Sequence, residues 1–190
     1  MKLTLKNATL SFPSLFTPET YQGQNPRFRA DVILNEDHVN AVKTTIHKVV
    51  ADVAGDKAEA VIKRLQTDAK RFPLRDGDNK VNSDGEIYAG YEGKQYVAAS
   101  AKENKPPKLY SRYKGVEPKE VDFFSGAEAD VILDVWFQDN KWGKAVNITL
   151  LGVRATGGGT PLGGSGASAS EDDFDFEEQP ASDIDDDIPW

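Results

Sequence analysis

Residues 128–155 read EADVILDVWFQDNKWGKAVNITLLGVRA, and they contain the clearest β-hairpin in the chain. In the first half, Val131, Leu133 and Val135 alternate with residues of mixed polarity, which is typical of a strand that buries one face. Turn residues 139–141 follow, and residues 142–155 return with a similar alternation. The hairpin therefore predicts an antiparallel β-sheet.

Further segments carry strand patterns. Residues 2–12 alternate apolar and polar residues with one slip, which indicates a bulge near Asn7. Residues 27–34 place two arginines and an aspartate on one face, and residues 95–101 form a short run of small residues. Together with the hairpin, these segments predict a mainly β fold.

A helical insertion is predicted between these strands, over residues 36–71. Asn35 is a good N-cap residue, and two acids follow it in the first turn, where the helix dipole favours negative charge. Valines and an isoleucine then recur at helical spacing until Gly55. A second helix follows and must end before Pro73.

The net charge of the chain conceals two parts of opposite sign. The 190 residues include 31 acids and 23 lysines and arginines, and the formal charge is −8. Ten of the acids lie in residues 171–190, and every lysine and arginine precedes them, so residues 1–170 carry about +2 and the remainder −10. A basic body with an acidic tail is a charge asymmetry that often marks nucleic-acid-related proteins.

Cysteine content and hydropathy restrict the class further. The chain has no cysteine, which excludes disulfides and thiolate metal sites. No apolar run approaches membrane-spanning length, and the N-terminal residues lack the apolar core of a signal peptide. We therefore expect a soluble, intracellular protein with no membrane partner.

The C-terminal part differs in composition from the rest. Residues 157–170 contain six glycines and three serines, as flexible linkers do. Residues 171–190 read EDDFDFEEQPASDIDDDIPW, and such a run of carboxylates resists burial. We predict a folded domain over residues 1–155, a linker over 156–170 and a disordered acidic tail over 171–190.

Cations and aromatic rings occur together in a pattern that suits single-stranded nucleic acid. Binding without sequence preference requires positive charge along the backbone and aromatic faces on which bases stack. The stretch from Lys102 to Lys114 supplies both, although any single residue could instead serve packing or face solvent. The candidate binding residues are Arg27, Phe28, Arg29, Tyr88, Tyr91, Tyr96, Lys102, Lys105, Lys108, Tyr110, Arg112, Tyr113, Lys114, Trp142 and Lys144.

A catalytic or metal site is difficult to build from this sequence. His38 and His47 fall on opposite faces of the predicted helix, and the polar loop over residues 76–85 lacks the ligand spacing of a calcium loop. No nucleotide-binding or hydrolase motif is present. Asp130 and Asp134 share a strand face and could bind Mg²⁺ in a nuclease, but solvated strand acids are commoner. We expect no enzyme, no cofactor and no metal.

Two resemblances connect the body with the tail. The last six residues, Asp185-Asp186-Asp187-Ile188-Pro189-Trp190, resemble the acidic tip of bacterial single-stranded-DNA-binding proteins, with Trp where that family ends in Phe. The body resembles phage-encoded single-stranded-DNA-binding proteins of the OB-fold type. The blocks that carry this second resemblance include Pro73-Leu74-Arg75-Asp76-Gly77-Asp78, Tyr88-Ala89-Gly90-Tyr91, Lys105-Pro106-Pro107 and Trp142-Gly143-Lys144-Ala145-Val146-Asn147.

The resemblance implies an OB-fold-like antiparallel barrel that coats single-stranded DNA during phage replication or recombination, in the cytoplasm of the infected bacterium. It also implies that the tip, residues 185–190, docks on a polymerase, a helicase-primase or an exonuclease. The tethered acids of the tail would compete with DNA for the basic groove of the body. A homodimer would cover the edge strands of so small a barrel.

Two other interpretations stay open on the sequence. One is a Mg-dependent nuclease or recombination accessory enzyme that uses the strand acids. The other is a protein-interaction module whose acidic tail mimics DNA. The excess of lysine and arginine around Tyr110 and Tyr113 disfavours this second interpretation.

Overall fold

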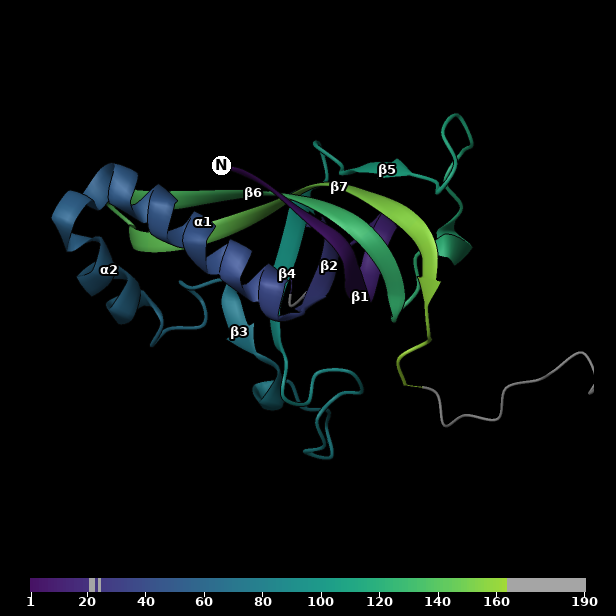
Figure 1. The fold of residues 1–190 in the computed structure, drawn as a ribbon, viewed down its shortest axis with the longest axis horizontal. Coiled ribbons are helices and arrows are strands. Elements are labelled where there is room, and N and C mark those ends of the chain that lie inside the picture. The colour runs from purple at the N-terminus through teal and green to yellow at the C-terminus, as the bar shows by residue number, and fades with distance from the viewer. Residues whose placement is uncertain (21–22, 24, 164–190) are drawn as a thin grey trace, which may run out of the picture.

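The computed structural model describes residues 1–20, 23 and 25–163 of the chain (Figure 1). In chain order the elements are β1 (Lys2–Glu19), β2 (Arg27–Leu34), α1 (Glu36–Ala54), η1 (Gly55–Lys57), α2 (Ala58–Leu65), β3 (Leu74–Asp76), η2 (Gly77–Asn79), β4 (Gln95–Lys102), β5 (Lys108–Tyr110), η3 (Glu120–Asp122), β6 (Ala127–Asn140) and β7 (Gly143–Gly159), where η marks a 3-10 helix.

Five of the strands close into a barrel (Figure 1). β1 pairs antiparallel with β2 and β6, β2 pairs antiparallel with β4, and β6 pairs antiparallel with β7. The ring closes where β4 meets β7 in parallel, with Ser100 opposite Thr149. β3 and β5 extend the sheet at its two ends. This small, mainly antiparallel barrel with a helical insertion confirms the predicted OB-fold-like architecture.

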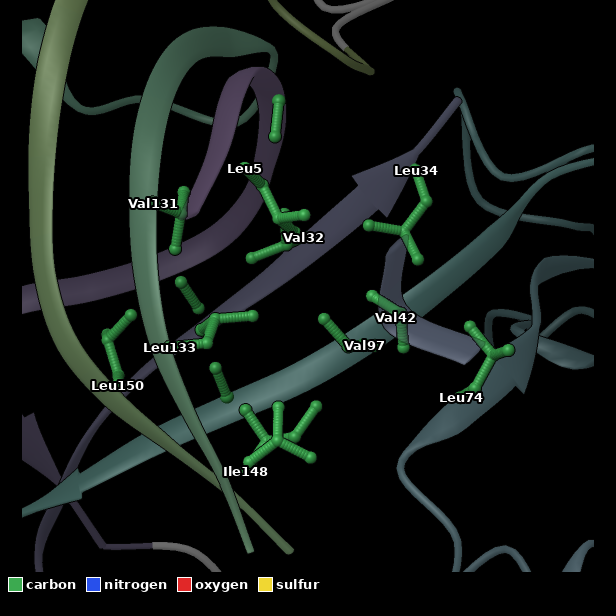
Figure 2. Packing of buried hydrophobic residues seen from close by; sticks show 14 of the residues in the cluster. Leu5, Val32, Leu34, Val42, Leu74, Val97, Val131, Leu133, Ile148 and Leu150 are labelled. Atoms are coloured by element: carbon green, nitrogen blue, oxygen red, sulfur yellow. The ribbon is translucent and has the colours of Figure 1, made fainter. Parts of the chain in front are cut away.

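One hydrophobic core fills the barrel and continues beneath α1 (Figure 2). Leu5, Val32, Val97 and Leu133 come from four different barrel strands, and each side chain is at most 1 % exposed. Val42 of α1 belongs to the same cluster. Removal of such side chains from water is the main favourable contribution to folding, so the inward positions of the strands are apolar.

The predicted hairpin is a long ladder between β6 and β7, with its turn at residues 140–143. α1 and α2 pack against the part of this hairpin that extends past the barrel (Figure 1). Val135 and Val146 are buried on the inner face there, whereas Trp136 and Asn147 alternate with them and face outward. The helical insertion therefore supports the hairpin from one side and leaves its other side open.

The folded body continues past residue 155, where the sequence predicted its end. β7 runs to Gly159, and Leu162 packs against a second apolar cluster. A Cβ atom at position 159 would lie 2.1 Å from the carbonyl oxygen of Gly126, so glycine permits the close pairing of β6 with β7. Residues 164–190, with the rest of the predicted linker and the acidic tail, lie outside the described residues.

The helical insertion begins where the sequence predicted. The Asn35 side chain accepts a hydrogen bond from the backbone N–H of His38 at 2.9 Å and so caps α1. The helix ends at Ala54, and its C-cap is Gly55, whose φ of 53° is easily reached without a side chain. Among residues 1–20, 23 and 25–163, no helix combines the length and the hydropathy needed to cross a membrane.

The insertion ends earlier than predicted, because α2 stops at Leu65 and not near residue 71. Beyond that point the Asp68 carboxylate accepts a hydrogen bond from the backbone N–H of Lys70 at 2.9 Å. Aspartate side chains that bond nearby backbone in this way compete with the helical hydrogen-bond pattern. Residues 66–73 consequently form turns that lead into β3.

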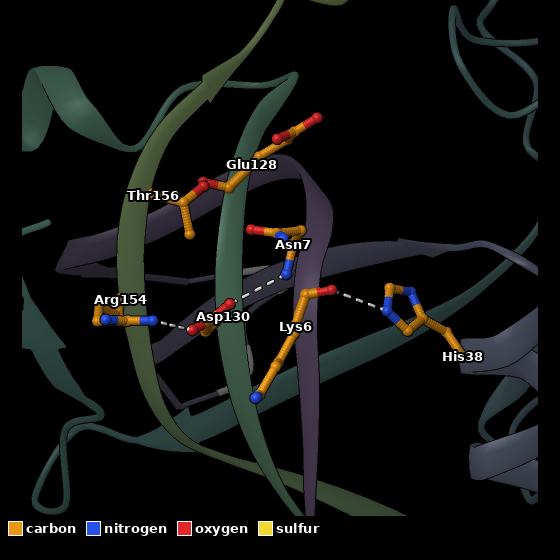
Figure 3. A network of polar contacts seen from close by, with 7 residues as sticks. All are labelled: Lys6, Asn7, His38, Glu128, Asp130, Arg154 and Thr156. Carbon is orange, nitrogen blue, oxygen red and sulfur yellow. Dashed lines mark hydrogen bonds and ion pairs between the residues drawn. The ribbon is translucent and has the colours of Figure 1, made fainter.

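The predicted bulge lies in β1 at Lys6 and Asn7 (Figure 3). The register of β1 on β6 shifts there, and Asn7 adopts a φ of 51°, which asparagine tolerates better than most residues. The backbone N–H of Asn7 donates to the Asp130 carboxylate at 3.0 Å, and His38 Nε2 donates to the Lys6 carbonyl at 2.9 Å. Asp130 is also ion-paired with Arg154 of β7. Side chains from β6 and α1 thus satisfy the backbone of the bulge, and Arg154 of β7 holds the Asp130 carboxylate in place.

These contacts change the acidity of Asp130. Burial by itself raises the pKa of the Asp130 carboxyl, but hydrogen bonds from Arg154 and from the Asn7 N–H, with the charges of Arg154 and Lys6, hold that pKa below its usual value. A carboxyl with a lowered folded-state pKa stabilises the fold above its unfolded-state pKa. That stabilisation is lost as the pH falls through the folded-state pKa.

Asp130→Asn should lower the free energy of unfolding at about pH 7, because Arg154 loses its charged partner. The difference from the wild type should shrink as the pH falls below about 4, the ordinary pKa of an aspartate, and on through the lower pKa of the Asp130 carboxyl in the folded state. Urea denaturation at about pH 7 and about pH 3 measures both effects. Asp134→Asn is a matched control, because Asp134 lies on the same strand but pairs with the exposed N-terminal ammonium. An equal loss in both variants at neutral pH would contradict this account.

Candidate nucleic-acid interface

A groove of about 1090 Å³ crosses the outer surface of the barrel where β4 meets β7. Ala98 and Ser100 of β4 contribute to its lining, as do Asn147 and Thr149 of β7. Residues of the segment that leads into β3, of the β4–β5 connection, and of β1, β2, β5 and β6 also line it. OB-type barrels bind oligonucleotides on the face of their second and third strands, which here are β2 and β4.

Positive charge dominates this groove. Its lining includes seven lysines and arginines, namely Lys2, Arg27, Lys70, Arg75, Lys102, Lys105 and Lys108. Within the described part of the chain, no aspartate or glutamate lines the groove, and none of the seven cations forms an ion pair. A concave surface lined by one sign of charge focuses the electrostatic field and attracts ligands of the opposite sign.

Two aromatic side chains present accessible surface in the groove. Tyr110 of β5 is 51 % exposed, and Trp136 of β6 is 40 % exposed. The indole Nε1 of Trp136 donates to Thr149 Oγ1 at 3.2 Å, which fixes one edge of the ring. Exposed aromatic faces beside cations are the combination on which unpaired bases stack.

Two hydrogen-bond donors of the groove lack a partner. Arg75 Nε and Asn147 Nδ2 are buried and form no hydrogen bond with the described residues. In the described part of the chain, one other buried side-chain nitrogen has no partner, His38 Nδ1, which is not in the groove. An unpaired buried donor costs about 1–3 kcal/mol, so such atoms are rare in native structures. Acceptor atoms of a ligand would satisfy both donors.

A second, smaller groove of about 690 Å³ continues from the first. Residues 25–27 and 102–104 contribute to its lining. Arg27 and Lys102 line both grooves. The two hollows therefore form one path along the ends of β2 and β4, which an extended polymer could follow.

Some of the predicted binding residues meet in the main groove, namely Arg27, Lys102, Lys105, Lys108 and Tyr110. Arg27 Nη1 donates to Ser100 Oγ at 2.7 Å, which holds the guanidinium against β4. Arg29 is half-buried on β2, and its register partner on β4 is again Ser100. The basic stretch and the second strand are thus brought together by the fold.

Other predicted residues are exposed away from this groove. Arg112, Tyr113 and Lys114 lie on the loop between β5 and β6, with the Arg112 guanidinium 5.6 Å from the centroid of the Tyr113 ring. Trp142 lies at the β6–β7 turn and is 74 % exposed, and Lys144 is ion-paired within the same hairpin. None of these five lines the groove.

The remaining predicted residues are aromatic rings that the structure packs into its interior. Phe28 belongs to the main core, and Tyr91 and Tyr96 are at most 5 % exposed. Tyr88 is half-buried, with its ring edge-on to Phe12 at a centroid distance of 5.0 Å. Burial withdraws Phe28, Tyr91 and Tyr96 from a ligand, and Tyr88 does not line the groove, so the interface proposed below omits all four.

The buried tyrosines surround an ion pair. Lys80 Nζ lies 2.8 Å from the Asp31 carboxylate and between 5.3 and 5.9 Å from the ring centroids of Phe12, Tyr91 and Tyr96. The Tyr91 hydroxyl donates to the same carboxylate at 2.9 Å. Burial, followed by the negative charge of Asp31, raises the pKa of Tyr91 well above its usual value, so the hydroxyl remains a donor. This cluster attaches the loop before β4 to β2.

The groove also contains residues that the sequence did not single out, namely Lys2, Lys70, Arg75, Trp136 and Asn147. The sequence could have marked Trp136 as a candidate, because this aromatic residue stands on the outward face of the predicted hairpin. No local pattern marked Lys70 and Arg75 as binding residues, because only the tertiary fold brings their segment beside β4.

The closed barrel and its cationic groove place the chain among OB-fold-like proteins. A family model described as "Enterobacter phage Enc34, ssDNA-binding protein" matches residues 1–188, and the chain belongs to this family. A relative, "Putative protein p50" of Acyrthosiphon pisum secondary endosymbiont phage 1, is 31 % identical over 180 residues, which cover 92 % of this chain and 93 % of the relative.

Solved structures show the same fold. The single-stranded-DNA-binding protein of bacteriophage Enc34, in complex with ssDNA, is similar with a TM-score of 0.60 and 20 % identity, over 85 % of this chain and 89 % of that chain. The single-stranded-DNA-binding protein gp2.5 of bacteriophage T7 is similar with a TM-score of 0.51 and 13 % identity, over 94 % and 96 %. The resemblance to phage single-stranded-DNA-binding proteins is therefore confirmed.

The family consists of ssDNA-binding proteins and not of enzymes, which sets aside the nuclease interpretation. The structure gives a physical reason in the two strand acids. Asp130 is ion-paired with Arg154, and Asp134 lies 2.7 Å from the N-terminal ammonium. Each carboxylate is thus already neutralised by a cation of the protein.

Tyr91→Phe should lower the free energy of unfolding by about 1–3 kcal/mol, because Asp31 loses a donor in a buried setting. Its affinity for oligo-dT should equal that of the wild type. Tyr110→Ala should weaken oligo-dT binding and leave the free energy of unfolding unchanged, since Tyr110 is exposed in the groove. Urea denaturation and fluorescence anisotropy measure the two properties. Weaker DNA binding by Tyr91→Phe at unchanged stability would place Tyr91 in the interface and overturn its structural assignment.

Proposed function

We propose that this protein binds single-stranded DNA without marked sequence preference, and that the cation-lined groove holds the strand. The observation that carries the proposal is a groove with seven cations, no described carboxylate and two exposed aromatic rings. Membership of the Enc34 family and the fold shared with a relative solved in complex with ssDNA support it. The site of action would be the cytoplasm of the infected host, during phage replication or recombination.

The proposed binding has two physical parts. The lysines and arginines contact phosphates and release condensed counterions, which gives affinity that falls with salt. Tyr110 and Trp136 offer stacking faces, each worth about 1–3 kcal/mol per base. A duplex keeps its base faces within its own stack, so the second contribution is open to single strands alone. This difference would give the preference for single-stranded over duplex DNA.

Lys105→Glu combined with Lys108→Glu should weaken oligo-dT binding strongly and should flatten its salt dependence. The slope of log affinity against log salt should lose about 0.7 for each phosphate contact removed. Fluorescence anisotropy over a salt series measures both quantities. Lys43→Glu combined with Lys48→Glu is the matched control, because these exposed lysines of α1 make the same charge change outside the groove. Equal losses in the two double variants would mean that net charge, and not the groove, governs binding.

The second part of the proposal concerns the tail, residues 171–190, which lies outside the described residues. We propose that its tip docks on a replication or recombination protein. Ile188 and Trp190, with Pro189 between them, would enter an apolar pocket of the partner, while Asp185, Asp186 and Asp187 would face a basic rim. The support is the sequence resemblance to the acidic tip of bacterial single-stranded-DNA-binding proteins.

The tail would also compete with DNA for the groove. Its ten acids belong to the same chain as the seven groove cations, so they would reach those cations at a high effective concentration. A homodimer stays a prediction, since β3 and β5 are edge strands that a second copy could cover.

Deletion of residues 164–190 should tighten oligo-dT binding at low salt, because the competing anion is removed. The effect should fade at high salt, where both interactions are screened. Truncation after Gly163, and not after residue 155, preserves the end of β7 and the packing of Leu162. A full-length chain with the ten tail acids replaced by asparagine and glutamine is the control for tail length. Unchanged affinity in both variants would refute the competition.

A further inference from the structure

Asn147 occupies an unusual position in the groove. Its Nδ2 atom is buried and has no hydrogen-bond partner among the described residues, although the side chain lines the groove. Gln138, another amide of the same lining, shows the ordinary situation, because its Nε2 donates to Asn140 Oδ1 at 3.2 Å. Asn147 therefore offers a donor that the described residues leave unused.

Trp136 lies directly beside this donor. Asn147 is its register partner across the β6–β7 ladder, and side chains opposite each other in an antiparallel pair have Cβ atoms about 5 Å apart on the same face. The bond from the indole Nε1 to Thr149 Oγ1 limits rotation of the ring. A fixed aromatic face thus stands next to a free amide donor.

We propose that Trp136 and Asn147 together form a subsite for one nucleobase, in which the base stacks on the indole and accepts a hydrogen bond from Asn147 Nδ2. This inference rests on the proposed binding of single-stranded DNA by the groove. All four bases carry acceptor atoms on their edges and a π-face, so the subsite recognises a base as such and tolerates any sequence. The phosphates on either side would meet the cations of the groove.

The chemistry of the pair favours a base over a phosphate at this point. Phosphates are most strongly bound by charged donors, and the groove has seven lysines and arginines for that purpose. A neutral amide beside an aromatic face matches a neutral ring with polar edges better. The pair also stands on β6 and β7, which a long ladder and two supporting helices hold in place.

Asn147→Leu separates this subsite from a simple packing defect. Leucine has a similar size and no unpaired donor, so the variant should be as stable as the wild type or more stable. Its affinity for oligo-dT should nevertheless fall by about 5- to 30-fold, because one hydrogen bond to the base is lost. Asn40→Leu is the matched control, because it makes the same substitution on the exposed face of α1 outside the groove, and it should bind like the wild type.

A second probe shows whether the contact is with the base. In an oligonucleotide of the same length made of abasic sugar phosphates, wild type and Asn147→Leu should bind equally, since no base is present. An equal loss with oligo-dT and with the abasic probe would place Asn147 on the backbone and overturn the proposal. Equal binding of oligo-dT by wild type and Asn147→Leu would also overturn it, while the groove itself would stand. Failure of the wild type to bind either probe at low salt would refute the proposed function and the subsite with it.

Fluorescence gives an independent readout. The chain has three tryptophans, so Trp142→Phe with Trp190→Phe leaves Trp136 as the sole reporter. Oligo-dT should quench its emission and the abasic probe should not, because stacking requires a base. Quenching by both probes, or by neither at saturation, would contradict the stacking.

Discussion

The antiparallel ladder between β6 and β7 is the interaction on which the rest of the structure depends. Its inner face supplies Val131, Leu133 and Val135 to the barrel core and to the surface beneath the helices. Its outer face carries Trp136 and Asn147, and its second strand closes the barrel by meeting β4 at Ser100 and Thr149. The period of two along a strand thus assigns packing to one side of the hairpin and the proposed binding surface to the other.

Electrostatics follows from where the charges lie and not from their total. The formal charge of −8 would suggest a protein that repels DNA. The fold instead gathers seven cations in one hollow from segments as distant as Lys2 and Lys108, and leaves the described carboxylates elsewhere. Some of those carboxylates, such as Asp130 and Asp31, are used internally to hold a bulge and a loop. The ten acids of residues 171–190 account for the negative total, because residues 1–170 carry about +2.

The local sequence pattern predicted the strands and the helical insertion well, because each of these elements depends on residues that are neighbours in the chain. The hairpin, the Asn7 bulge and the Asn35 cap all follow from spacing and side-chain chemistry within a few positions. The groove depends on tertiary closure, so no local pattern marked its members Lys70 and Arg75 as binding residues. Dependence on tertiary packing also explains why the buried tyrosines were predicted as binding residues. Sequence shows Tyr91 near basic residues, but only packing against β2 shows that its ring is buried and its hydroxyl bound to Asp31.

The most direct test of this account is to map where DNA touches the protein. The full chain would be photo-cross-linked to oligo-dT that carries 5-iodouracil at single positions, and the attached residues would be identified by mass spectrometry. The account predicts cross-links to Trp136 and Tyr110 in the groove. Cross-links confined to Tyr113 and Trp142, which are more exposed but lie outside the groove, would contradict it.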